Sequence, residues 1–179
     1  MRPKKNLLLA LALAALVPTP AMADEPSPED AQELHTLHAR VALVLDEEGF
    51  EAFSELFHPD YTNWSSGDTV TRRKEYLAGV ERWYAEGNHA IHTQMAPVSV
   101  EVFGDIALSR YLLREDFNNG KSFVGTFASL SRRDAGRWKH YRTNFTTLYR
   151  GGTSELPPEL AERVASMARH AVPGIPAAR

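Results

Sequence analysis

The sequence predicts an α+β domain in which helices come first and a curved antiparallel sheet follows. Residues 98–149 contain strand-like runs rich in Val, Phe, Tyr, Thr and Leu, and short turns at 104–105 and 134–136 join them in pairs. Residues 28–86 mainly repeat apolar side chains at helical spacing. These two patterns indicate helices packed against a sheet of hairpins.

The first 23 residues have the features of a secretory signal peptide. A basic start is followed by an apolar run over 7–17 that is too short to span a bilayer, and by a small-x-small site at Ala21-Met22-Ala23. We therefore expect an exported protein, periplasmic or secreted, with no membrane attachment after cleavage. The chain has no cysteine, so its core must stabilise it without disulfides.

Composition also limits the partners. Removing the three basic residues of the leader lowers the net charge from −3 to −6. No basic cluster or basic amphipathic helix remains, which argues against nucleic acid or anionic lipid as a partner. We expect a linker over 24–29, one domain over 30–150 and a C-terminal appendage over 151–179 that is partly helical and then disordered.

Three helices are expected before the main sheet. The first spans 28–48, with Ser27 as its N-cap and Gly49 after its end, and the second spans 50–57. An extended piece over 61–64 and a turn over 65–68 lead to the third helix, 72–86, which Thr71 would cap.

From residue 89 the apolar period changes to two. Strands are expected at about 89–103, 106–117, 122–133 and 137–149. Pro97 lies inside the first of them, and a proline there predicts a bulge or an edge position.

Three motifs in order connect this pattern to a known fold. They are Phe-His-Pro-Asp-Tyr at 57–61, Val-Phe-Gly-Asp-Ile-Ala at 102–107, and the arginine- and tryptophan-containing turn at 131–139. Over about residues 30–149 the chain resembles the nuclear transport factor 2-like (NTF2-like) cone, in particular the SnoaL-like and DUF4440 families. The resemblance implies a curved antiparallel sheet with three N-terminal helices on its concave face. The fold hosts isomerases, dehydratases, cyclases, ligand binders and association modules, so it specifies no activity.

The resemblance also implies which strand residues face the inside of the cone. Ala107 and every second residue to Glu115 would point inward, as would Trp138 and every second residue to Thr146. A shift of one residue would invert either set. The expected pocket residues are Tyr61, Trp64, Trp83, His92, Tyr111, Glu115, Arg142 and Asn144.

Each of these residues also has a structural interpretation. The aromatic residues could be core packing, and Glu115 could lie at the solvent rim. Arg142 could pair with Glu115, which would make both structural. His35 and His38 could share a helix face, but no carboxylates accompany them, so we expect exposed or capping histidines and no metal site. No cofactor is indicated.

Three functions stay open. The leading hypothesis is binding of a small, largely apolar organic molecule in the pocket. The second is an acid–base enzyme, an isomerase or lyase, that uses His92 or Glu115 with Tyr111. The third is an association module that forms a homodimer through the outer face of the sheet.

Overall fold

The computed structural model describes residues 26–65 and 69–167, and the predicted signal peptide lies outside them. The helices are α1 (Pro28–Glu47), α2 (Phe50–Glu55), α3 (Arg73–Ala85) and α4 (Pro158–Met167), with a 3-10 turn at Thr153–Glu155. The strands are β1 (Phe57–Trp64), β2 (Val70–Arg72), β3 (Ala90–Phe103), β4 (Ile106–Phe117), β5 (Lys121–Asp134) and β6 (Arg137–Gly152).

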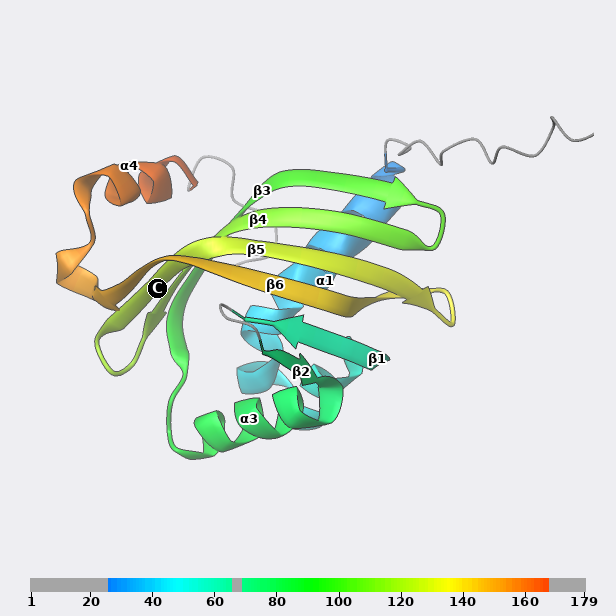
Figure 1. Ribbon diagram of the computed structural model, residues 1–179, viewed down its shortest axis with the longest axis horizontal. Helices are drawn as coiled ribbons and strands as arrows, with labels where there is room; N and C mark the ends of the chain where they lie inside the picture. The colour runs from blue at the N-terminus through cyan, green and yellow to red at the C-terminus, as the bar shows by residue number, and fades with distance from the viewer. Residues whose placement is uncertain (1–25, 66–68, 168–179) are drawn as a thin grey trace, which may run out of the picture.

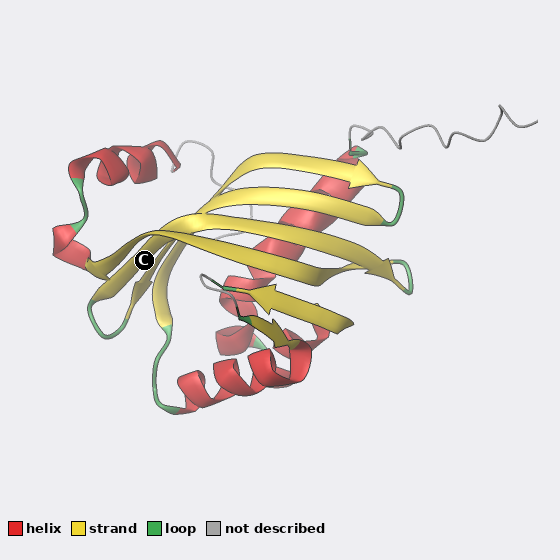
Figure 2. Ribbon diagram, in the orientation of Figure 1, coloured by secondary structure: helices red, strands yellow, loops and turns green. Residues whose placement is uncertain are grey.

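One curved sheet contains all six strands, in the order β2-β1-β6-β5-β4-β3. Neighbouring strands are antiparallel except β1 and β6, which are parallel. Helix α1 crosses one face of the sheet, and α3 lies below the β1–β2 end (Figure 1; Figure 2). The predicted α+β cone with N-terminal helices on a curved sheet is confirmed.

The helix boundaries follow from local chemistry. Ser27 caps α1, because its Oγ accepts a hydrogen bond from the Asp30 N–H at 3.1 Å. Gly49 has φ of 87°, a left-handed conformation that glycine adopts without strain, and it separates α1 from α2. The predicted cap of α3 is wrong by one residue. Thr71 belongs to the short strand β2, and Arg72 is the N-cap, where its N–H donates to Glu75.

Pro97 behaves as predicted. It lies on β3, the edge strand, and the register with β4 shifts between Pro97 and Ser99. Proline has no backbone N–H to donate, and on an edge strand the sheet can lack that donor without losing a hydrogen bond.

The inner residues of β4 are also as predicted. Ala107, Ser109 and Tyr111 are fully buried, Leu113 is nearly so, and Glu115 lines the cavity described below. Regular pairing with β5 along the whole strand keeps this alternation intact.

Strand β6 is interrupted by a bulge. Leu130 of β5 pairs with Arg142, whereas the next residue, Ser131, pairs with His140. Tyr141 is therefore an extra residue without a partner on β5, and such a bulge inverts the alternation of every side chain beyond it.

The predicted inner face of β6 is wrong beyond this bulge. Thr143 is buried and Phe145 lines the cavity, while Arg142 is exposed on the opposite face. Asn144 and Thr146 alternate with Phe145 and likewise face away from the cavity. The sheet thus removes Arg142 and Asn144 from the predicted pocket.

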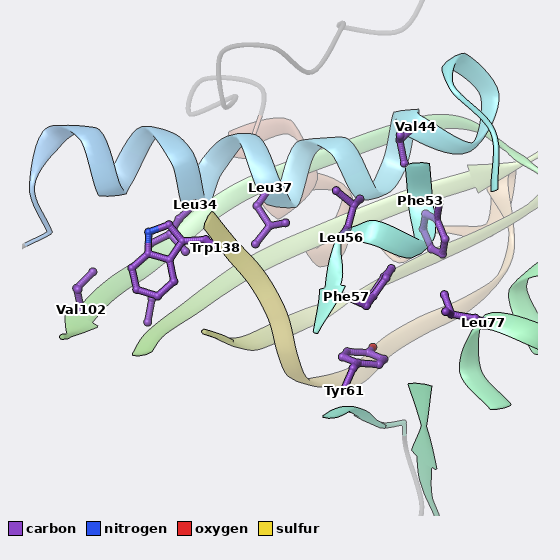
Figure 3. Close-up of a cluster of buried hydrophobic side chains, with 11 residues drawn as sticks. Leu34, Leu37, Val44, Phe53, Leu56, Phe57, Tyr61, Leu77, Val102 and Trp138 are labelled. Carbon is purple, nitrogen blue, oxygen red and sulfur yellow. The ribbon is translucent and has the colours of Figure 1, made fainter. Parts of the chain in front are cut away.

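The largest buried cluster lies between α1, α2, α3 and the concave side of the sheet (Figure 3). Leu34 and Leu37 reach down from α1 beside Trp138, and Phe57 packs between Phe53 and Tyr61. Burial of so much apolar surface is the main force that holds the helices to the sheet.

The C-terminal helix α4 covers part of the other face. Val164, on α4, is 4% exposed and packs against Ala96, Leu112 and Val124, which point away from the concave side. The predicted appendage therefore includes a helix that folds back onto the domain. No helix in the described part of the chain is long and apolar enough to cross a membrane.

Candidate functional site

A cavity of about 500 Å³ lies between α1, α3 and the concave face of β3–β6. Its wall is mainly apolar and aromatic. Helices and strands both contribute to it: Val41, Leu45, Phe53, Val80, Trp83, Met95, Leu113, Phe117, Phe127 and Phe145. Polar side chains interrupt this surface, and they include Glu115, Tyr76, His38, Lys121 and Arg150.

Glu115 is the cavity's most perturbed acid. It points inward from β4, and its neighbours in register are Thr93 of β3 and Phe123 of β5. Burial raises the pKa of the Glu115 carboxyl to about 7, because ionisation is costly where water is excluded. The carboxyl therefore exchanges its proton near neutral pH.

Tyr76, on α3, lies near Glu115 in the cavity wall. Its hydroxyl is buried in the cavity wall, and burial, followed by the charge of nearby Glu115, raises the pKa of Tyr76 to about 12. A neutral phenol is a hydrogen-bond donor and acceptor. The Tyr76 hydroxyl also shares a hydrogen bond with Tyr61, so Glu115 offers its carboxyl and Tyr76 its remaining hydrogen-bonding capacity to a bound molecule.

His38 is buried where the cavity meets the core. It is 1% exposed, and its ring lies 4.5 Å from the ring centre of Tyr111 and 4.9 Å from that of His140. Neither nitrogen has a hydrogen-bond partner among the described residues. Burial, then the nearby histidines, holds the pKa of His38 well below its usual range, so the ring is neutral at pH 7.

The unpaired nitrogens of His38 belong to a larger group. In residues 26–65 and 69–167, five buried side-chain polar atoms lack a partner, and the others are Nε2 of His140 and Oγ of Ser109 and Ser131. They lie together, since Ser131 pairs with His140 in register and Ser129 joins His140 Nδ1 at 2.9 Å. Burial lowers the pKa of His140 to about 3. Buried polar atoms without partners are rare in proteins and mark this patch as unusual.

Two predicted pocket tyrosines are instead core residues. Tyr111 is fully buried, and its hydroxyl forms a hydrogen bond with His35 Nδ1 at 2.8 Å. Tyr61 is 1% exposed, and its hydroxyl is bonded to that of Thr143 at 2.5 Å. Each tyrosine has an internal partner and lies outside the cavity wall.

The remaining predicted residues divide in the same way. Trp83 lines the cavity and packs edge-on against Phe117, with ring centres 5.7 Å apart. Trp64 is 54% exposed at the end of β1. His92 pairs in register with Asp116, which places it on the sheet face opposite Glu115. Of the eight predicted residues, the structure brings only Trp83 and Glu115 together in the cavity wall.

Sequence reasoning missed His38, Tyr76 and the cation Arg150. The expectation that His38 is exposed or capping is wrong, because His38 lies on the face of α1 that packs against the sheet and is buried there. Its spacing within the apolar stripe of the helix was the available signal. Tyr76 lay in the apolar stripe of α3 and resembled ordinary core packing. Among the described residues, no three His, Asp or Glu side chains gather closely enough to hold a metal ion.

Comparison with known proteins is consistent with this geometry. The model of the SnoaL-like domain matches residues 26–144. No curated protein matches the chain in sequence.

Solved structures share the fold at low identity. A candidate scytalone dehydratase from Novosphingobium aromaticivorans is 14% identical with a TM-score of 0.59, over 69% of this chain and 87% of that one. A hexachlorocyclohexane dehydrochlorinase, LinA type 2, is 13% identical with a TM-score of 0.54, over 73% and 95%. An NTF2-like protein of unknown function from Shewanella oneidensis is 11% identical with a TM-score of 0.55, over 64% and 97%. At these identities the structures show a common fold and no common activity. The family match covers well over half of the chain, which therefore belongs to the SnoaL-like domain family.

Proposed function

We propose that this protein binds a small, largely apolar organic molecule in the cavity between α1, α3 and the sheet. The observation that carries the proposal is a mainly apolar cavity of about 500 Å³ whose wall also carries polar side chains. Binding sites for small molecules are typically ~300–1,000 Å³ and have this kind of lining.

The polar groups refine the kind of molecule expected. Trp83 and Phe117 offer flat apolar surface, which suits an aromatic or alicyclic body. Glu115 and Tyr76 offer hydrogen bonds to one polar atom of the ligand, such as a carbonyl or hydroxyl oxygen. A flat molecule with one oxygen function fits both features.

A cavity-filling substitution tests this proposal. The probe is N-phenyl-1-naphthylamine, a neutral aromatic amine whose fluorescence rises in apolar surroundings. We expect saturable binding to the wild-type chain, and at least a roughly tenfold weaker affinity for Ala42→Trp, because Ala42 lines the cavity and a tryptophan there occupies its volume. Ala78→Trp is the matched control, since Ala78 is exposed on α3 and outside the cavity wall. Equal binding by both variants would refute the proposal, provided that circular dichroism shows both to be folded.

Proton transfer is the second candidate function, and the raised pKa of Glu115 favours it. A carboxylate with a pKa near 7 is a competent general base at neutral pH. His92 faces away from the cavity and Tyr111 lies outside its wall, so the hypothesis now rests on Glu115 with Tyr76, which lines the cavity and shares a hydrogen bond with Tyr61. The carboxylate would remove a proton from carbon beside a carbonyl, and the Tyr76 hydroxyl would donate a hydrogen bond to the developing enolate oxygen.

Deuterium exchange measures this activity without a known substrate. 2-Tetralone in D₂O is followed by proton NMR, and exchange of its α-protons beyond the buffer rate is the expected result. Glu115→Gln should reduce the enzyme-dependent rate by about a hundredfold or more. His92→Gln, on the other face of the sheet, should leave it unchanged. The acid–base hypothesis fails if the two variants exchange alike.

Export of the protein and formation of a homodimer remain predictions from the sequence. The signal peptide lies outside the described residues. For the homodimer, α4 covers Ala96, Leu112 and Val124 on the outer face, so a second copy would have to use the uncovered part of that face. Light scattering at micromolar concentration distinguishes the dimer from a monomer.

A further inference from the structure

One row of residues in register crosses the inner face of β4, β5 and β6, and its two outer members line the cavity. In register, Glu115 of β4 pairs with Phe123 of β5, and Phe123 pairs with Arg150 of β6. Paired strands lie ~4.8 Å apart, so Glu115 and Arg150 flank Phe123 with roughly 10 Å between their backbones. The row places a carboxyl and a guanidinium on either side of an aromatic ring.

A second cation lies beside the first. Lys121 is two residues before Phe123 on the same face, diagonal to Arg150 across the β5–β6 ladder, and both side chains line the cavity. Residues this far apart on one face are within reach of long side chains. The guanidinium carbon of Arg150 lies 5.8 Å from the ring centre of Phe123, a buried ring that packs against Phe145 of the cavity wall.

These cations have no anionic partner in the protein. Within the described residues, neither Lys121 nor Arg150 has a carboxylate oxygen within 4.0 Å. The acids of the cavity wall are otherwise engaged, because Asp46 accepts a hydrogen bond from Tyr84 and Glu115 holds its proton up to about neutral pH. The cavity wall therefore carries, at the start of β5 and the end of β6, two exposed cations that form no ion pair among the described residues.

We propose that the ligand is an amphipathic anion, whose flat apolar body lies against the aromatic side chains of the cavity wall and whose carboxylate, sulfonate or phosphate group meets Arg150 and Lys121. This inference rests on the proposed binding function and narrows its ligand class. Guanidinium and ammonium groups recognise such anions directly. The row also leaves Glu115 free to meet an oxygen function on the opposite side of the same ligand.

A matched pair of probes isolates the charge. 8-Anilinonaphthalene-1-sulfonate has the body of N-phenyl-1-naphthylamine with a sulfonate added. We expect the wild-type chain to bind the sulfonate more tightly than the neutral amine at low salt. The double variant Lys121→Gln/Arg150→Gln should lose about tenfold in affinity for the sulfonate and almost none for the amine.

The control removes the same charge elsewhere. Arg132→Gln/Arg142→Gln deletes two exposed cations that lie over Tyr141, away from the cavity. It should leave the affinity for both probes unchanged, and unfolding curves establish that each variant is folded.

The outcomes separate this inference from the proposed function. If the amine binds in the cavity but the sulfonate gains nothing, or if both double variants weaken the sulfonate equally, the anion proposal is wrong while ligand binding stands. If neither probe binds to the wild-type chain, the binding function fails and the anion proposal with it.

Discussion

The two ends of the concave face are built from the same strands and crossed by the same helix, yet one is filled and the other open. At the filled end, Leu34 and Leu37 of α1 pack against Trp138 (Figure 3). At the open end, Val41 and Leu45, further along α1, line the cavity. Closure of the core at one end therefore does not require closure at the other.

The two ends also differ in how well their buried charged groups are compensated. At the filled end, Asp30 accepts hydrogen bonds from Arg133 and from Trp138 Nε1, so its charge is compensated. Toward the open end, Glu115 has no cation paired with it among the described residues, and its pKa is raised. Proteins tolerate such local conflicts mainly where function needs them. The contrast supports the proposal that the open end binds a ligand, while the filled end stabilises the fold.

The largest effect should come from truncation at the filled end. Leu34→Ala removes a fully buried side chain, and we expect a loss of about 3–4 kcal/mol in the free energy of unfolding, measured by urea titration. Leu113→Ala, at the cavity wall, should cost about half as much, because its neighbours already leave space. Equal losses would contradict the contrast between the two ends.

The next effect concerns Glu115 and pH. Its pKa is raised in the folded state to about 7, from 4.5, so the carboxyl favours folding while protonated in both states. This contribution is complete below about pH 4.5 and is lost as pH rises through about 7, a change of up to about 3 kcal/mol.

Glu115→Gln isolates that contribution. The difference in unfolding free energy between variant and wild type should grow in favour of the variant from pH 5 to pH 8. The buried histidines titrate in both proteins and cancel in the comparison. A difference that stays constant with pH would show that Glu115 is well solvated.

A smaller effect, a gain in the free energy of unfolding, is expected when His38 is replaced. His38→Phe keeps an aromatic ring against Tyr111 and His140 and removes two buried nitrogens without partners. Replacing such groups by apolar ones of similar shape should stabilise the fold by about 1–2 kcal/mol in thermal or urea unfolding. Destabilisation would mean that the nitrogens are paired, for example through internal water.

The smallest effect tests the bulge in β6. Arg142→Ala should change the free energy of unfolding by less than about 0.5 kcal/mol and leave binding of N-phenyl-1-naphthylamine unchanged, because Arg142 is exposed on the opposite face. Weaker probe binding would return Arg142 to the cavity and contradict the register at Tyr141.

Strand alternation explains how much of the site was predictable. Along β4 the pairing is regular, so the inward position of Glu115 followed from that of Ala107. Along β6 the extra residue Tyr141 reverses the alternation, and nothing local in the sequence marks it. Arg142 was therefore expected in the pocket, whereas Arg150, beyond a second register shift, lines it.

The fold was easier to predict than the cavity because its evidence is local. Hairpin turns, helix stripes and three motifs established the order of elements. The cavity depends on how far apart α1 and α3 lie on the sheet, and that spacing is set by tertiary packing. Only that packing shows that His38 and Tyr76 border the cavity while Tyr61 and Tyr111 lie in the core.

The most direct test of the open end is the titration of the Glu115 carboxyl by carbon-13 NMR, with Glu115→Gln used to assign its signal. A desolvated cavity predicts a midpoint near pH 7, well above the ordinary value for a glutamate carboxyl. A midpoint near the ordinary value of about 4.5 would mean that water fills this end freely and would contradict the account of an apolar ligand pocket.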